Sequence, residues 1–309
     1  MNKCTGFTDL CIPVAATDVL EPILREAIEL GYRNIAIEQI FDASKALISN
    51  KNDAIPKPHC LKELKAAIGG QLRLLNRLTV MFSDTSVSLI LNKSNNLRGY
   101  NLIAALPTNE SSFQYACQTM ACDLITYSSA ASHLKMNRKF YYLAVDRNIA
   151  FEIKYAPAII NSNERKATIK RAHRYHSFGK SKNVIISSNA LNPFQLRSPY
   201  DIVNLGLIFG LSEEQSKESI RGVPNRILLS AEGRRFGKAG VVISLRDKKA
   251  MAEDSDDYSD GELEEAISDE EKEDGSDPDV DMCKANETDE DDTELMRPPK
   301  KMAKHDKSS

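Results

Sequence analysis

Two residue types that build metal centres are scarce in this chain. A metal-dependent hydrolase on a barrel scaffold places several histidines and aspartates at its strand ends, but this chain of 309 residues has only five histidines. They are His59, His133, His173, His176 and His305. No two cysteines are spaced as a CxxC pair, which argues against a zinc ribbon. The six cysteines are Cys4, Cys11, Cys60, Cys117, Cys122 and Cys283.

Common catalytic signatures are also missing. The sequence contains no GxxxxGK[ST] phosphate loop, no GxSxG elbow and no HExxH motif. It has no basic-then-apolar leader and no apolar run near the roughly 18 residues of a membrane helix. We therefore expect a protein with reduced thiols in the cytosol or nucleus and no membrane partner.

One histidine pair needs separate consideration as a metal site. His173 and His176 are three residues apart on an expected helix and could share one face. Lys170, Arg171 and Arg174 surround them, and cations repel a metal ion. This setting favours solvated or RNA-facing histidines.

Charge is distributed very unevenly along the chain. Residues 251–309 hold 23 acidic and 7 basic residues, which gives this segment a net charge of −16. The remaining 21 acidic and 34 basic residues give residues 1–250 a net charge of +13. A basic body with an acidic tail indicates a polyanionic partner for the body, most simply nucleic acid.

The composition also changes abruptly after Lys249. Asp, Glu and Ser dominate from there on, and apolar periodicity disappears. Such a segment cannot bury enough apolar surface to offset chain entropy. We expect a folded domain over residues 1–249 and a disordered acidic tail over residues 250–309, ending in a short basic cluster.

Apolar runs alternate with helical patterns through the body, as in βα units. The expected strands are Phe7 to Pro13, Tyr32 to Gln39, Leu74 to Ser83, Leu102 to Leu106, Leu124 to Tyr127, Tyr142 to Val145 and Val184 to Ser187. The expected helices are Asp18 to Leu30, Leu61 to Ile68, Ser112 to Met120, Arg165 to Ser177, Pro199 to Phe209 and one beginning after Ser212. Asp18 and Ser212 are the expected N-caps of the first and last of these helices, and Glu21 is in capping-box position to Asp18. Gly31 is expected to end the first helix.

This alternation implies parallel pairing with crossover helices. Seven or eight units within about 245 residues fit a closed (β/α) barrel of the TIM type better than two open sheets. The alternative is a doubly wound sheet.

Two carboxylates near one expected strand are candidates for chemistry. Asp146 and Glu152 flank a strand end in AVDRNIAFEIKY. Such a pair could act as acid and base or bind magnesium. Asp146 could equally pair with Arg147 or cap a turn, so both interpretations stay open.

The basic residues are more informative than the carboxylates. Lys166, Lys170 and Arg174 are four apart, so on a helix they form one basic stripe suited to a phosphate backbone. Tyr175 and Phe178 lie among them and could stack on unpaired bases. The full first cluster is Arg165, Lys166, Lys170, Arg171, Arg174, Lys180 and Lys182. A second cluster, in GRRFGK, consists of Arg234, Arg235 and Lys238, with glycines that free backbone amides to approach phosphate.

Several segments carry a family resemblance. They are FTDL, ELGYRNIAI, LNRLTVMFSD, ACDLITYS, LAVDRNIAFEIKYAPAI, KNVIISSNA and RSPYDIVNLGLIFGLSE. In this order, from about residue 7 to 245, they resemble the thirty-kilodalton protein subunit family shared by ribonuclease P and ribonuclease MRP. VDRNIAFEIKYAPAI and PYDIVNLGLIFGLS are the specific matches.

The resemblance implies a fold, a partner set and a location. The fold would be a TIM-like barrel related to the polymerase-and-histidinol-phosphatase superfamily, whose strand-one HxH motif is absent here, where Thr8 and Asp9 stand instead. The chain would be a non-catalytic subunit that supports RNA-catalysed removal of the 5′ leader from precursor tRNA, and precursor rRNA processing. It would bind no cofactor, since the partner RNA uses magnesium. Expected partners are ribonuclease P RNA, MRP RNA, other protein subunits including a small RRM-like one, and precursor tRNA indirectly.

The resemblance also carries over individual positions. The family-matched residues are Asp9, Asp146, Arg147, Glu152, Tyr155, Pro157, Ser187, Asp201, Asn204 and Gly206. Asp9, Asp146 and Ser187 are expected at the carboxyl ends of strands, organising that face rather than forming a working active site. Relatives act in the nucleolus, and the cluster from Arg297 to Lys307 could be a nuclear import signal. The competing function is a stand-alone metal-dependent barrel phosphoesterase, which the missing HxH argues against.

Overall fold

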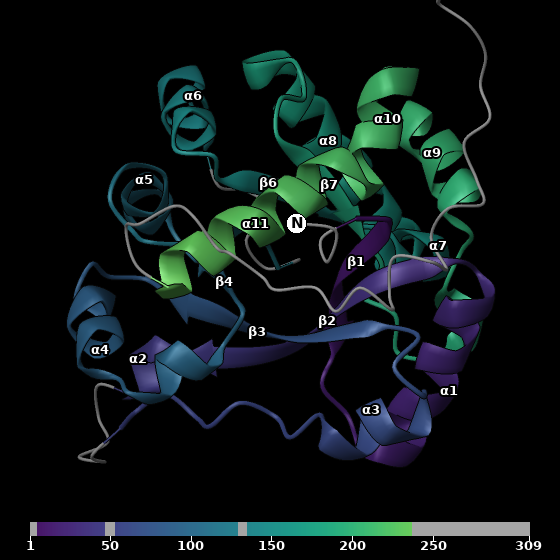
Figure 1. Cartoon of the computed structure of the whole chain (residues 1–309). Coiled ribbons are helices and arrows are strands. Elements are labelled where there is room, and N and C mark those ends of the chain that lie inside the picture. The colour runs from purple at the N-terminus through teal and green to yellow at the C-terminus, as the bar shows by residue number, and fades with distance from the viewer. Residues whose placement is uncertain (1–4, 47–52, 129–134, 237–309) are drawn as a thin grey trace, which may run out of the picture. The chain divides into compact units, whose positions relative to one another are not determined.

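The computed structural model describes residues 5–46, 53–128 and 135–236. Seven parallel strands pair in chain order to form one curved sheet (Figure 1). The strands are β1 (Phe7–Pro13), β2 (Tyr32–Asp42), β3 (Arg73–Phe82), β4 (Leu102–Pro107), β5 (Leu124–Ile125), β6 (Ala150–Lys154) and β7 (Val184–Ser187). The described residues therefore form a nearly closed α/β barrel, which confirms the expected fold class.

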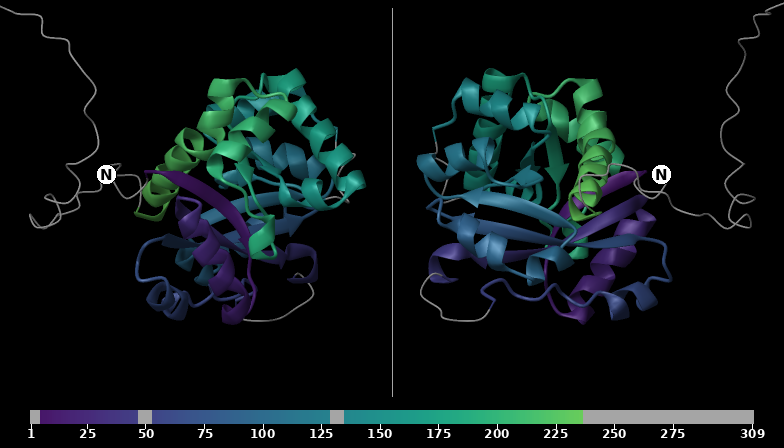
Figure 2. Two further views of the ribbon diagram at one scale, coloured as in Figure 1. Left: turned by 90° about the vertical axis from the view of Figure 1, so that its right-hand side faces the viewer. Right: turned by 60° about the vertical axis from the view of Figure 1, so that its left-hand side comes forward.

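Helices connect the strands, because parallel neighbours require crossover connections. They are α1 (Thr17–Glu29), α2 (Ala43–Ala46), α3 (Lys62–Ala67), α4 (Val87–Lys93), η2 (Asn96–Gly99), α5 (Glu110–Gln118), α6 (Arg138–Asp146), α7 (Ala156–Ile160), α8 (Ser162–Gly179), η4 (Pro193–Gln195), α9 (Pro199–Ile208), α10 (Glu213–Ile220) and α11 (Gly222–Phe236). Most of them lie around the outside of the sheet (Figure 2). None of the described helices is long and apolar enough to cross a membrane.

The seam between β1 and β7 is closed by polar contacts instead of a strand ladder. Asn189, just after β7, donates its backbone N–H to the Cys11 carbonyl at 2.7 Å. The buried carboxylate of Asp9 accepts backbone N–H groups from Cys11 at 3.1 Å and from Ser188 at 3.0 Å. Asp9 lies at an irregularity in the β1–β2 register, which frees its side chain for this bridging role.

Helix α11 closes the amino-terminal end of the barrel. Its apolar residues Val223, Ile227, Leu228 and Ala231 pack against a cluster of small and aliphatic side chains from inside the strands. Arg226 also contacts Asn183 before β7 at 3.4 Å. The opposite, carboxyl-terminal end is thus the one left for a functional site.

Most expected elements are present, with shifts of one to three residues at their ends. Gly31 follows α1 with φ of +87°, as expected of a helix stop. Ser212 caps α10 in a full capping box with Gln215. The expected cap at Asp18 is wrong, because α1 begins at Thr17 after Ala16, and Ala16 makes no side-chain cap.

One expected strand is wrong. Tyr142 to Val145 lies within helix α6, which Asn137 caps and which buries Tyr141 and Ala144. The true strand is β6, eight residues further on, and buried along its whole length. A short apolar run does not distinguish a strand from a helix segment, which explains the error. The acidic tail, residues 250–309, lies outside the described residues.

Candidate functional site

A cavity of about 560 Å³ opens among the carboxyl ends of the strands. Its lining includes apolar residues from the strand ends and following loops, among them Val14, Ile40 and Pro157. Glu38, Thr79 and Lys154 supply polar groups to the same lining. Barrel enzymes place their chemistry at this end of the fold, so the cavity is the first candidate for a site.

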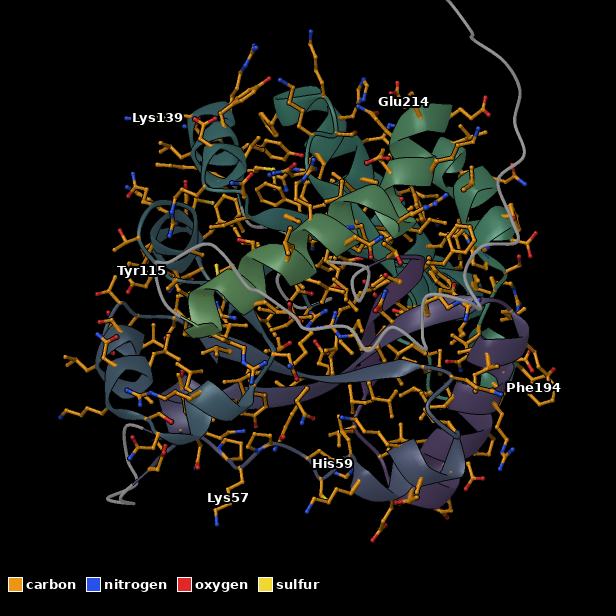
Figure 3. The ribbon with its side chains drawn as sticks, viewed as in Figure 1. Lys57, His59, Tyr115, Lys139, Phe194 and Glu214 are labelled. Atoms are coloured by element: carbon orange, nitrogen blue, oxygen red, sulfur yellow. The ribbon has the colours of Figure 1, made fainter. Side chains whose placement is uncertain are left out.

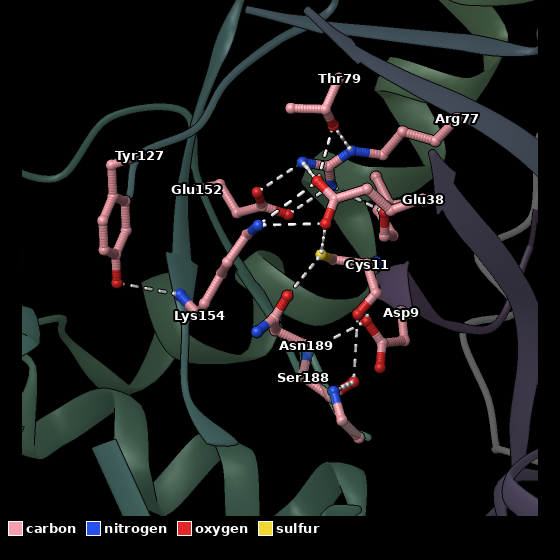
Figure 4. A network of polar contacts seen from close by, with 12 residues as sticks. Asp9, Cys11, Glu38, Arg77, Thr79, Tyr127, Glu152, Lys154, Ser188 and Asn189 are labelled. Carbon is pink, nitrogen blue, oxygen red and sulfur yellow. Dashed lines mark hydrogen bonds and ion pairs between the residues drawn. The ribbon is translucent and has the colours of Figure 1, made fainter. Parts of the chain in front are cut away.

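A buried network of charges lies beside this cavity (Figure 4). The Arg77 guanidinium donates to both carboxylate oxygens of Glu152, at 2.5 and 2.7 Å, and lies 3.0 Å from a Glu38 oxygen. Lys154 Nζ lies 3.3 Å from both oxygens of Glu38, and Thr79 donates its hydroxyl to Glu38 at 2.6 Å. Two cations thus face two carboxylates, and the network is close to neutral.

The pKa values of the carboxyls follow from this pairing. Burial opposes ionisation of Glu38, but the charges of Arg77 and Lys154 outweigh it and lower its pKa to about 2. Burial likewise opposes ionisation of Glu152, and Arg77 lowers its pKa below the usual value. Both carboxyls are therefore ionised at neutral pH, so neither is a proton donor.

Cys11 and Asp9 lie beside this network. The Cys11 thiol donates to Glu38 at 3.2 Å and to the Asn189 side chain at 3.5 Å. Burial raises its pKa well above the ordinary value, so it is a neutral thiol and a poor nucleophile. Burial raises the pKa of Asp9 to about 6, although hydrogen bonds from Ser188 and Cys11 oppose the rise.

This donor set does not resemble a metal site. The oxygens of Glu38 and Glu152 are taken up by Arg77, Lys154 and Thr79, and protein cations supply the positive charge. No group of three His, Cys, Asp or Glu residues suited to a metal ion occurs among the described residues.

Helix α8 carries most of the first basic cluster. Lys166 and Lys170 are exposed and Arg174 is half-buried, so the expected stripe runs from open surface into a partly covered position. Arg165 instead donates to the carbonyls of Ala158 and Ile159 at the end of α7, at 2.8 and 2.9 Å. It holds two helices together.

Two further cluster members lie beside aromatic rings, and a third ends helix α8. The Arg171 guanidinium carbon lies 3.6 Å from the centre of the Tyr127 ring, a stacked arrangement. Lys182 Nζ lies 5.7 Å from the centre of the Tyr142 ring. Lys180 is exposed and adopts the left-handed conformation that ends α8. Lys180 and Lys182 are exposed to solvent, whereas Arg171 is half-buried. Lys139 of α6 extends outward from the molecule (Figure 3).

The second basic cluster has a different setting from the one expected. Arg234 forms a half-buried ion pair with Asp123 at 2.7 Å. Because Asp123 directly precedes β5, this pair holds α11 to the amino end of that strand. Gly233 lies inside α11, so the expectation of free glycine amides is wrong at this residue. Arg235 is exposed, and Lys238 lies outside the described residues.

The family-matched acid Asp146 is not at the carboxyl end of a strand, which corrects the prediction. It is the exposed last residue of α6, at the amino side of β6, and does not approach buried Glu152. The neighbouring Arg147 donates to the carbonyls of Ala116, Cys117 and Met120, which caps the end of α5.

Four of the remaining matched positions lie in the packed interior or in a helix turn, and two are exposed. The buried Tyr155 hydroxyl accepts the Arg197 backbone N–H at 3.1 Å, and Pro157 lies in the first turn of α7. Ser187 is buried at the end of β7, as expected. Asp201 and Asn204 are exposed on α9. On the same helix, a Cβ added to Gly206 would lie 2.2 Å from Ser216 Oγ, so α9 and α10 require glycine for close packing.

Sequence reasoning missed Glu38, Arg77 and Lys154. The signal was present, because each is a charged residue in a strand with a largely buried pattern. Charges in such positions are almost always paired when buried.

Comparison with known proteins gives the family. The model of "RNase P subunit p30" matches residues 6–236. Ribonuclease P protein subunit p30 of Mus musculus is 31% identical over 82% of this chain and 95% of the mouse protein. Ribonuclease P/MRP protein subunit RPP1 of Saccharomyces cerevisiae is 24% identical over 70% of this chain and 73% of the yeast protein.

A solved structure agrees on the fold. One chain of the cryo-EM structure of archaeal ribonuclease P with mature tRNA superposes with a TM-score of 0.58 and 13% identity. The match covers 78% of this chain and 99% of the archaeal one. Since the family match spans nearly all described residues and the barrel is shared, this chain belongs to the ribonuclease P subunit p30 family.

Proposed function

We propose that this chain is a non-catalytic protein subunit of ribonuclease P, and also of ribonuclease MRP. In this function it positions and stabilises a catalytic RNA that removes the 5′ leader from precursor tRNA, and in MRP one that processes precursor rRNA. The RNA holds the magnesium used in hydrolysis, and the protein binds no cofactor. Its other partners are fellow protein subunits, including a small RRM-like one, and precursor tRNA is contacted indirectly.

One observation carries the non-catalytic part of this proposal. The buried carboxylates at the carboxyl end of the barrel are neutralised by Arg77 and Lys154. A metal-dependent phosphoesterase needs carboxylates and imidazoles left open for its ion. The stand-alone phosphoesterase is therefore the weaker hypothesis.

RNA contact is assigned to the exposed cations of α8 and the loop after it. Lys166, Lys170 and Lys182 are exposed, and they belong to a body with a net charge of +13. Lysines on a regular surface suit phosphate contacts without sequence preference.

A tagged pull-down from nuclear extract tests the subunit function. We expect one or two discrete noncoding RNAs in the eluate, together with cleavage of precursor tRNA at the leader. Recovery of the protein without RNA or processing activity would refute the proposal. Activity of the purified chain on a phosphoester with manganese or zinc would instead support the alternative.

We assign the protein to the nucleus and nucleolus, in keeping with its proposed partners. The segment from Arg297 to Lys307 is the candidate import signal. Fused to a reporter too large to diffuse through nuclear pores, it should direct the reporter to the nucleus. Retention of that fusion in the cytosol would exclude this segment as the signal.

A further inference from the structure

A second, smaller pocket lies beyond the carboxyl ends of β4 and β5, against helix α8. Its volume is about 20 Å³, enough for one water-sized group. Pro107 and Thr126 bring the two strand ends to it. The remaining lining residues are Phe113, Ile125, Lys135, Met136, Arg171, Arg174 and Tyr175.

The charge of this pocket is of one sign. Lys135, Arg171 and Arg174 line it, and no acidic residue of the described part of the chain does. Arg171 and Arg174 are three residues apart on α8 and therefore project from one face of the helix. The larger cavity differs, since Lys154 there is paired with Glu38 and Glu164 also lines the wall. The small pocket is therefore the better of the two for an anion.

Two polar atoms at this pocket are buried and have no hydrogen-bond partner among the residues that the structure describes. They are the hydroxyl of Thr126, a residue 2% exposed, and the Nε of Arg171. A buried polar group without a partner costs free energy, so such groups in a folded protein indicate a bound water or ligand. Both are donors able to bind an oxygen atom.

The position of Arg171 is fixed before any ligand arrives. Its guanidinium carbon lies over the Tyr127 ring, 3.6 Å from the ring centre. A stacked guanidinium loses little side-chain freedom on binding, and its planar fork matches a phosphate group. Arg174 is half-buried, whereas Lys135 is exposed at the pocket edge.

From these observations we infer that the pocket is a phosphate-binding site for a phosphodiester of RNA. One non-bridging oxygen enters the pocket and accepts hydrogen bonds from Thr126 Oγ1 and Arg171 Nε. Arg174 and Lys135 neutralise the charge that remains outside. The apolar side chains of Phe113 and Met136 pack against the neighbouring ribose. This inference rests on the proposed function, because it takes the polyanion to be RNA.

Binding of a fluorescent uridine 12-mer to the full chain, measured by anisotropy across salt concentrations, tests the inference. Replacing Arg171 and Arg174 with glutamine should remove one phosphate contact. The slope of log affinity against log salt should then decrease by about 0.7, with affinity about fivefold weaker at 0.1 M salt. The control is Lys93→Gln, an exposed lysine on α4 outside the pocket, which should leave slope and affinity unchanged.

Thr126→Val separates phosphate binding from folding. Valine has the shape of threonine but no hydroxyl, and the hydroxyl has no partner within residues 5–46, 53–128 and 135–236. The variant should unfold at the same urea concentration as the original chain, or a higher one. Its affinity for the 12-mer should be roughly tenfold weaker with an unchanged salt slope, because a hydrogen bond is lost but no charge. Unchanged affinity of Thr126→Val, or an unchanged slope in the double arginine variant, would overturn the inference.

Two further measurements identify the source of the phosphate and distinguish failure of this inference from failure of the proposed function. A phosphoserine peptide that binds more tightly than the 12-mer, and loses binding in Thr126→Val, would replace RNA with a phosphoprotein. If leader-cleaving activity copurifies with the original chain but the pocket variants bind RNA normally, the phosphate-binding site is rejected. The proposed function as a ribonuclease P subunit is then retained. Absence of that activity from the eluate of the original chain would reject the subunit function itself.

Discussion

Replacing Arg77 with methionine should destabilise the barrel severely. Arg77 is fully buried and holds Glu152 through two short hydrogen bonds, Glu38 through an ion pair, and the Leu10 carbonyl at 2.7 Å. Removing one member of a buried ion pair leaves the opposite charge uncompensated, at a cost of about 3–5 kcal/mol. With a urea m-value of about 2–3 kcal/mol/M, the midpoint should fall by roughly 1–2.5 M.

A second substitution should recover part of the stability that Arg77→Met loses. Removing Glu152 as well, in Arg77→Met/Glu152→Leu, eliminates the stranded carboxylate while Lys154 still pairs with Glu38. The double variant should therefore be more stable than Arg77→Met alone. Lys217→Met breaks an exposed pair with Glu213 and should leave the urea midpoint nearly unchanged. Equilibrium urea unfolding at pH 7 measures all three. A cost below about 1 kcal/mol for Arg77→Met, or simple additivity in the double variant, would refute the argument.

Three other perturbations probe the seam, the helix packing and the basic stripe. Burial raises the pKa of Asp9 from 3.8 to about 6, so the folded state binds its proton more tightly than the unfolded state does. Stability should fall by roughly 3 kcal/mol as pH rises from about 4 to above 6. Asp9→Asn should lack this component, and identical pH profiles from urea unfolding would contradict the assignment. Gly206→Ala should lower the free energy of unfolding by about 1–3 kcal/mol, because the added Cβ meets Ser216. Gly233→Ala has open space in α11 and should raise it by about 0.5–1 kcal/mol. Equal shifts in melting temperature for the two variants would be inconsistent with close packing of α9 on α10. A triple glutamine variant tests the stripe of Lys166, Lys170 and Arg174. It should weaken RNA binding and flatten the salt dependence, whereas an unchanged slope would indicate a protein-facing stripe.

The alternation of apolar runs with helical patterns predicted an α/β fold and favoured a barrel over a doubly wound sheet. Strands buried on both faces must be rich in apolar residues, and crossover helices need an amphipathic stripe, so both leave local signals. The capping box at Ser212 and the glycine stop at Gly31 are equally local, and the structure confirms both. The strand expected at Tyr142 to Val145 was wrong because four apolar residues fit either element, and only packing decided between them.

The family could also be read from the sequence, because its motifs are contiguous segments. The roles of single residues could not, since each depends on a partner far along the chain. Arg77 lies 75 residues from Glu152, and Arg234 lies 111 residues from Asp123. No local pattern indicates that one arginine closes a charge network and the other fastens α11 to the barrel.

The sequence by itself determined the basic body, the acidic tail, the βα alternation and the family, because each is a property of composition or of neighbouring residues. Tertiary structure alone decided which charges remain available. It placed Arg165, Arg147 and Arg234 in internal contacts and left Lys166 and Lys170 exposed. It also brought the cations of α8 to the end of β5, where a buried hydroxyl has no partner among the described residues. The physical reason is that charge is encoded residue by residue, whereas its pairing is fixed only when distant segments meet.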